Sequence, residues 1–176
     1  MRQLLILFFL SSSLFSISQD SIQLRKKFLR NQNVALVSLS SWSMVNIAFS
    51  SLKLTKLPEI GSPISRKTYF NQMNLSWNFV NMGICSLGYL KNRKYKSNNW
   101  PHVNLKNTIQ KYQKSLVLNS CLDIVYITSG ILLRINSKNI SNIERSIGFG
   151  NSLITQGCFL LAFDLIYLKS LRKLIH

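Results

Sequence analysis

Four long, predominantly apolar stretches constrain the fold of this chain more than any other feature. They cover about residues 34–52, 69–90, 116–133 and 147–168. About 20 apolar residues in a helix cross the hydrocarbon core of a bilayer. Each stretch is too long for an ordinary strand, and its polar residues recur at helical spacing. The sequence therefore predicts an all-α fold, a membrane-embedded bundle of four transmembrane helices within one domain over residues 19–176.

The charge of the chain is strongly basic, and its distribution indicates what it contacts. There are 22 Lys and Arg against 5 Asp and Glu, which gives a formal net charge of +17. Such a charge can bind nucleic acid through phosphate contacts. Here, however, the basic residues cluster between the apolar stretches, as in residues 91–96 and 169–173, where membrane proteins contact lipid headgroups. We expect the lipid bilayer as partner, with a membrane-protein partner or homo-oligomer as further options, and no nucleic acid.

The first 18 residues have the pattern of a secretory signal peptide or hydrophobic leader. A basic Arg2 precedes a short apolar run, and Ser16 and Ser18 form a small-x-small cleavage pattern before Gln19. The apolar run is short for a span of ~20 residues, and an uncleaved first helix is the alternative interpretation.

Two amphipathic segments flank the predicted spans. Residues 21–30 combine an apolar face with several basic residues, as an interfacial segment at a membrane surface does. A second such run precedes the third stretch and predicts an amphipathic helix that leads into it. Their apolar residues are Leu24 and Phe28 in the first segment, and Leu105, Ile109 and Tyr112 in the second.

The orientation of the chain in a membrane stays open. A cleaved leader would place the mature N-terminus outside the cell, together with the connection over residues 91–114. That connection carries seven Lys and Arg and no acid. The positive-inside rule would place it on the cytoplasmic side instead.

Two of the five acids, Asp123 and Asp164, fall inside predicted spans. A charged residue near the centre of a membrane helix costs ~2.5 to 3.5 kcal/mol on insertion scales, so both acids are functional hypotheses. Antiparallel helices would place the two in the same half of the membrane, and both share a helix face with other polar or small residues. These faces comprise Trp42 and Asn46; Asn71, Asn74, Asn78 and Asn81; Asn119, Tyr126 and Gly130 with Asp123; and Gly150 and Gly157 with Asp164.

These polar faces have two interpretations. Amides and hydroxyls between membrane helices commonly hold a bundle together, at about 0.6 kcal/mol per hydrogen bond, which favours a structural or accessory membrane subunit. The alternative is a small transporter, channel or ligand-binding protein that uses the acids. Its ligand- or ion-binding residues would be Asp123, Asp164, Asn46, Asn78, Asn81, Asn119, Tyr126 and Gln156. An enzyme is not favoured, because the sequence has no nucleophile–base or metal-ligand pattern; we expect no catalytic residue, cofactor or metal.

Three segments resemble those of an uncharacterised family of small bacterial four-helix membrane proteins. They are QMNLSWNFVN at residues 72–81, NSCLDIVY at 119–126 and QGCFLLAFDLIY at 156–167. The resemblance covers about residues 34–168. It implies a multi-pass protein of the bacterial inner (plasma) membrane with these polar positions in its interior, and it implies no activity.

Overall fold

Four long helices build the molecule. The computed structural model describes residues 2–55, 63–96, 104–139 and 142–175. Within them lie α1 (Arg2–Leu54), α2 (Arg66–Lys96), α3 (Leu105–Ile135) and α4 (Ile143–Arg172), with the 3₁₀ turn η1 (Asn136–Asn139) between the last two. No strand occurs in the described residues. The predicted all-α bundle is confirmed.

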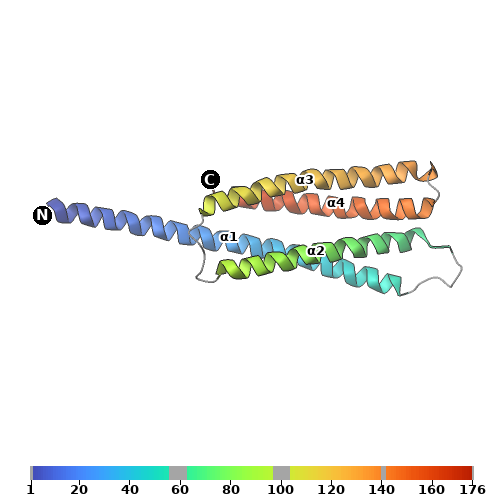
Figure 1. The fold of residues 1–176 in the computed structure, drawn as a ribbon, viewed down its shortest axis with the longest axis horizontal. Helices are drawn as coiled ribbons and strands as arrows, with labels where there is room; N and C mark the ends of the chain where they lie inside the picture. Colours follow the sequence, from blue (N-terminus) through green and yellow to red (C-terminus); the bar gives the residue numbers. More distant parts are fainter. Residues whose placement is uncertain (1, 56–62, 97–103, 140–141, 176) are drawn as a thin grey trace.

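The helices are arranged as two antiparallel pairs that lie side by side. Helices α1 and α2 form one pair, and α3 and α4 form the other (Figure 1). The two pairs are joined mainly through α2 and α4. At one end of the bundle, α1 finishes and α2 begins, next to the end of α3 and the beginning of α4 (Figure 1). At the other end, α2 and α4 finish near the beginning of α3.

Three helical segments are long and apolar enough to cross a membrane, namely Ile22–Leu54, Leu105–Lys138 and Ile143–Arg172. Helix α2 has 31 residues, so its length would suffice, but it is not one of these three. Its inner face carries five buried asparagines, whereas its outer face exposes Phe79, Val80, Ile84 and Leu87. The span predicted over residues 69–90 is thus a helix with a polar inner face and an apolar outer one.

Glycines let α3 and α4 approach closely at the end where the two helices are connected. A Cβ atom on Gly130 would lie 2.6 Å from the backbone oxygen of Gly150, and the converse distance is also 2.6 Å. Farther along, a Cβ on Gly157 would lie 2.8 Å from Ile127. Small residues at membrane-helix interfaces favour such close backbone packing. The predicted contact role of Gly130, Gly150 and Gly157 agrees with these positions.

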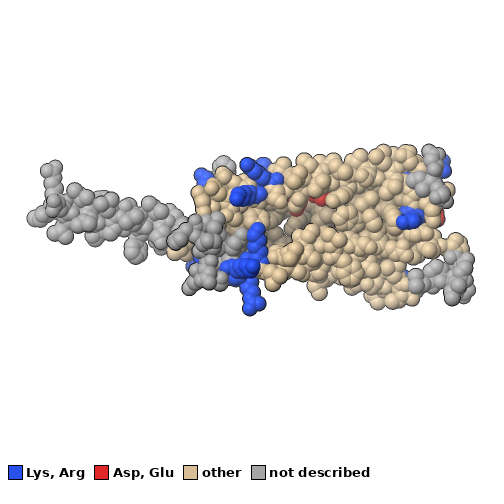
Figure 2. Space-filling model, viewed as in Figure 1, with Lys and Arg blue, Asp and Glu red and all other residues tan. Residues whose placement is uncertain are grey.

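The opposite end of the bundle, which we call the basic end, closes on an apolar cluster. Phe28 is fully buried, and its ring packs edge-on against Tyr112 with 5.6 Å between centroids. Ile109, Leu168 and Leu171 complete the contact. Lysines and arginines gather near this end on the face that Figure 2 shows. The predicted amphipathic segments are therefore turns of α1 and α3 that pack within the bundle, because their apolar faces find each other there.

The boundary predicted after Ser18 falls inside α1, which continues through it as one helix. The segment expected to lie along the membrane surface, residues 21–30, is collinear with the first span for the same reason. Removal of a leader stays a prediction.

Candidate functional site

One buried side chain, Asn74 of α2, connects three helices. Its Nδ2 donates hydrogen bonds to Oδ1 of Asn46 at 3.0 Å and to Oγ of Ser50 at 2.9 Å, both on α1. Its Oδ1 accepts a hydrogen bond from Nε2 of Gln156 on α4. Oε1 of Gln156 in turn accepts from Nε1 of Trp42 at 3.2 Å. We call these five residues the amide network; they use amide groups as hydrogen-bonding contacts between helices.

Neighbouring contacts extend the amide network. Nδ2 of Asn78 donates to the backbone oxygen of Asn74 at 2.7 Å, and the Asn78 side chain is completely buried. The Trp42 ring stacks on Phe159 of α4, with centroids 3.9 Å apart. Three residues predicted as ligand-binding candidates, Asn46, Asn78 and Gln156, therefore lie in or beside a region that holds the bundle together.

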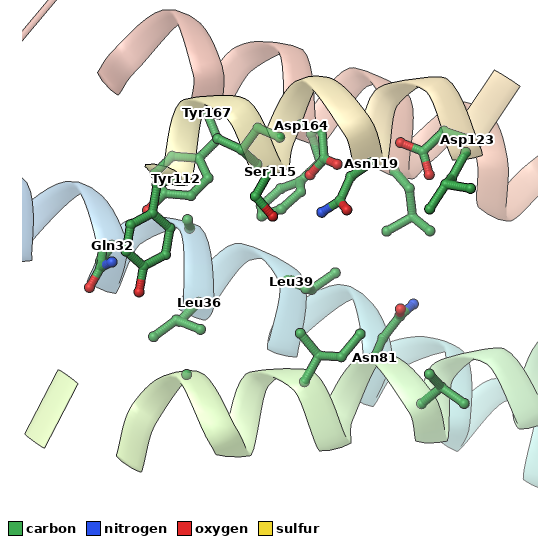
Figure 3. Close-up of a pocket in the computed structure, with 18 of the residues that line it drawn as sticks. Gln32, Leu36, Leu39, Asn81, Tyr112, Ser115, Asn119, Asp123, Asp164 and Tyr167 are labelled. Atoms are coloured by element: carbon green, nitrogen blue, oxygen red, sulfur yellow. The ribbon is translucent and has the colours of Figure 1, made fainter. Parts of the chain in front are cut away.

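The other predicted residues surround a cavity of about 440 Å³ between the two helix pairs, on the side of the basic end. Asp123 of α3 and Asp164 of α4 both line it, with exposed fractions of 4% and 6%. Asn119 lies between the two carboxyl groups (Figure 3). Both acids thus face one common interior, as antiparallel helices predict. Asn81 and Tyr126 also line this cavity.

Several polar atoms at the cavity have no hydrogen-bond partner. They are Oδ2 of Asp123, Nδ2 of Asn81, Oε1 of Gln32 and Nε1 of Trp77. Asp123, Asn81 and Gln32 are each less than 5% exposed. Buried polar groups in proteins normally have a partner, and leaving one unmet costs ~1 to 3 kcal/mol. The cavity therefore presents donors and acceptors that a bound molecule could satisfy.

Two of these residues, Gln32 and Trp77, are absent from the sequence-based candidates. Trp77 stands four residues before Asn81, so the helical spacing that selected the asparagines also includes it. Gln32 precedes the predicted first span, and only the packing of α1 against the other helices places it at the cavity. Tyr112 and Tyr167 are also absent from the sequence-based candidates, and they line the cavity near the basic end (Figure 3).

The charge of the cavity is not balanced from within. None of the described residues that line it is Lys or Arg. An ion pair between Arg66 and Glu144, at 3.1 Å, lies at the far end of the bundle and is exposed. Two carboxylates that share a cavity with mostly apolar walls repel each other, so the site favours uptake of a cation or a proton.

The remaining walls are apolar and aromatic. Tyr126 of α3 meets Trp77 of α2 with 4.8 Å between ring centroids, and Phe163 and Tyr167 of α4 form the wall beside Asp164. Ring faces attract organic cations, and mostly apolar pockets with a few polar groups are typical of small-molecule sites. No group of three metal-ligating side chains occurs in the described part of the chain. The aromatic and apolar walls around two carboxyl groups are thus suited to binding a small molecule.

Residues 38–165 match the model of a family of unknown function, DUF6992. The matched range includes both cavity acids and the whole amide network, whereas Gln32 and Tyr167 lie just outside it. No curated protein and no solved structure matches the chain.

Proposed function

Because the chain belongs to the DUF6992 family, for which no function is known, we propose a function from the cavity itself: the protein binds a small organic cation within the membrane. The observation that carries this proposal is the unpaired Oδ2 of Asp123, which is buried at a cavity shared with Asp164 and without a lining Lys or Arg. A bound ammonium group would supply both the missing hydrogen bond and the missing charge.

The contrast with the amide network supports a binding role for the acids. At Asn74, which joins three helices, both sides of the amide have partners. At the cavity, Nδ2 of Asn81 and Oδ2 of Asp123 have none despite comparable burial, and outside the cavity Oδ1 of Asn78 beside the amide network also lacks a partner. Unpaired polar groups are expensive at membrane depth, so their presence beside open space favours a ligand.

The composition of the walls favours an organic cation over a hydrated metal ion. Calcium sites use six to eight oxygen ligands, and magnesium retains several waters. This cavity offers two carboxylates among aromatic and aliphatic side chains such as Trp77, Phe163 and Leu39. Aromatic faces next to a carboxylate match an ammonium group attached to an apolar body.

A structural or accessory subunit is the second candidate function, and the amide network favours it. The side chains of the amide network point into the chain's own bundle, where they account for its cohesion. An accessory role would in addition use the exposed apolar surface against a partner's helices or a second copy.

Both functions require residence in a membrane as a multi-pass protein, with the bacterial inner membrane as the expected location. The expressed protein should stay in the membrane fraction after carbonate extraction at high pH, because apolar helices resist conditions that remove proteins bound by charge alone. Release into the supernatant would contradict both functions.

Binding is tested with benzylammonium and its neutral analogue benzyl alcohol on protein in phosphatidylcholine nanodiscs, by calorimetric titration. Benzylammonium should bind, and Asp123→Asn or Asp164→Asn should weaken binding roughly tenfold or more, since a hydrogen bond to a charged group contributes about 1.5–3 kcal/mol. Glu144→Gln is the matched control, because it neutralises a carboxylate that lies far from the cavity. Equal binding of the alcohol, or of both Asp variants, would contradict the proposal and leave the structural role.

A further inference from the structure

We infer that the cation is an amphiphile that enters the cavity sideways from the lipid bilayer, through an opening between α2 and α3. This inference rests on the proposed function and adds the class of ligand and its route. At the boundary of the cavity, side chains of α2 and α3 meet at two places, and the two helices stay apart between them.

Two side-chain contacts mark the ends of this opening. Trp77 of α2 meets Tyr126 of α3, with 4.8 Å between ring centroids. Toward the basic end, Nζ of Lys91 on α2 lies 4.8 Å from the ring centroid of Tyr112 on α3. The interval is 14 residues on each helix, from 77 to 91 and from 112 to 126. At 1.5 Å per residue the opening is about 21 Å long, comparable to an extended alkyl chain.

The residues between these contacts belong both to the cavity and to the outer surface. Val80 and Ile84 of α2 and Leu122 of α3 line the cavity, yet they are 54%, 55% and 44% exposed. Exposed Asn119 stands among them and reaches toward the acids (Figure 3). Figure 2 shows a hollow between the two helix pairs with acidic atoms visible in it. The cavity is therefore open to this side.

Contacts between α1 and α4 narrow the other side of the cavity. Nδ2 of Asn31 donates to the backbone oxygen of Ser170 at 3.4 Å near the basic end. Farther along, Trp42 and Phe159 stack at 3.9 Å. The backbones of α1 and α4 also approach each other directly, whereas those of α2 and α3 hardly do, so the wider opening lies on the α2–α3 side.

The route from water along the helix axis is unfavourable to a cation. Phe28 and Tyr112 pack across the basic end, and the lysines and arginines around it repel positive charge (Figure 2). The lateral opening has apolar edges instead, formed by Val80, Ile84 and Leu122. With hydrocarbon outside these edges, a molecule that arrives there needs an apolar chain, and its charged head would then meet the acids.

The test uses dodecylammonium brominated on its chain, because bromine quenches tryptophan fluorescence on contact. Trp42→Phe and Trp100→Phe leave Trp77, at the edge of the opening, as the only reporter. In phosphatidylcholine nanodiscs the amine should quench Trp77 at a concentration roughly tenfold lower than the equally brominated dodecanol does, the factor expected for a charge-assisted hydrogen bond. Asp123→Asn should abolish this difference.

Filling the opening provides the second measurement. The double variant Val80→Phe, Leu122→Phe should reduce quenching by the amine several-fold. The matched control is Leu87→Phe, Ile166→Phe, because both positions are exposed and neither lines the cavity. The control should behave as the parent protein does.

The outcomes separate this inference from the proposed function. Asp123-dependent binding of benzylammonium, with no gain from the alkyl chain and no effect of filling the opening, would overturn lateral entry and leave the proposed function standing. Equal quenching by amine and alcohol would contradict the inference that the ligand is a cation. Loss of Asp dependence for both benzylammonium and dodecylammonium would overturn the inference and the proposed function together.

Discussion

The amide network and the cavity lie in succession along the same helices, yet their buried amides differ in whether they have hydrogen-bond partners. Asn74 and Asn81 are separated by seven residues of α2 and share its inner face. Both are almost fully buried, at 1% and 3% exposure. Nδ2 of Asn74 donates to two side chains of α1, whereas Nδ2 of Asn81 has no partner. Residue type and burial alone therefore do not decide whether an amide stabilises this bundle.

The spacing between the helix pairs explains the difference. At the end where α2 and α4 begin, a Cβ atom on Gly148 of α4 would lie 2.6 Å from the backbone oxygen of Arg66. Helices this close bring short amide side chains within hydrogen-bonding distance. Beyond the Trp77–Tyr126 contact, large side chains line the space between the pairs and it stays open. In one half of the bundle small residues let the helices pack closely, and in the other half aromatic residues line the cavity.

The largest expected effect comes from Gly150→Leu in the closed half. A Cβ there would lie 2.6 Å from the Gly130 backbone oxygen, which cannot move without separating α3 from α4. We expect a loss of about 3 kcal/mol or more in the free energy of unfolding, measured by titration with dodecyl sulfate in micelles. Gly83→Leu is the control, since a Cβ at Gly83 would meet nothing within 4 Å. Equal effects at both positions would refute the close contact.

Asn74→Leu and Asn81→Leu make the same change in the two regions. The first removes four side-chain hydrogen bonds and should cost about 2.5 kcal/mol or more, at ~0.6 kcal/mol for each bond with an added cost for the partners left buried. The second removes an unpaired donor beside the cavity, so stability should stay within about 0.5 kcal/mol of the parent. A large loss for Asn81→Leu in the same unfolding titration would erase the distinction between the regions.

Asp123→Asn should change the stability of the ligand-free protein only slightly, and should raise it rather than lower it. It removes one of two like charges from a cavity that lacks a lining Lys or Arg. We expect unchanged stability or a gain of up to about 1 kcal/mol, measured by thermal denaturation followed by circular dichroism. Marked destabilisation would mean that the carboxylate joins helices as the amide network does.

The smallest effect should come from the ion pair at the closed end. Glu144 and Arg66 contact each other at 3.1 Å, but their side chains are 46% and 48% exposed. Exposed pairs contribute little and are screened by salt, so Glu144→Gln should cost less than about 0.5 kcal/mol. Thermal denaturation at low and high ionic strength checks this. A larger cost would mean that the ion pair, and not the glycine contacts and the amide network, holds this end of the bundle together.

Some features follow from local sequence and are correspondingly well predicted. The four helices, three of them apolar enough to span a membrane, follow from the length and periodicity of the apolar stretches. The shared interior of Asp123 and Asp164 follows from helix faces and antiparallel order. The contacts of Gly130 and Gly150 follow from spacing in the same way. Each is a property of one helix or of its order in the chain.

The division between structural and cavity residues was decided by tertiary structure alone. Periodicity grouped Asn46, Asn78 and Gln156 with the acids, but hydrogen bonds place the first and last in the amide network and Asn78 directly beside it. Gln32, by contrast, joined the cavity from outside the predicted spans. Periodicity tells which side chains point inward, whereas the distance between the helix pairs decides whether an inward amide meets a partner or open space. That distance depends on contacts such as Gly148 against Arg66 and Trp77 against Tyr126, which join residues far apart in the chain.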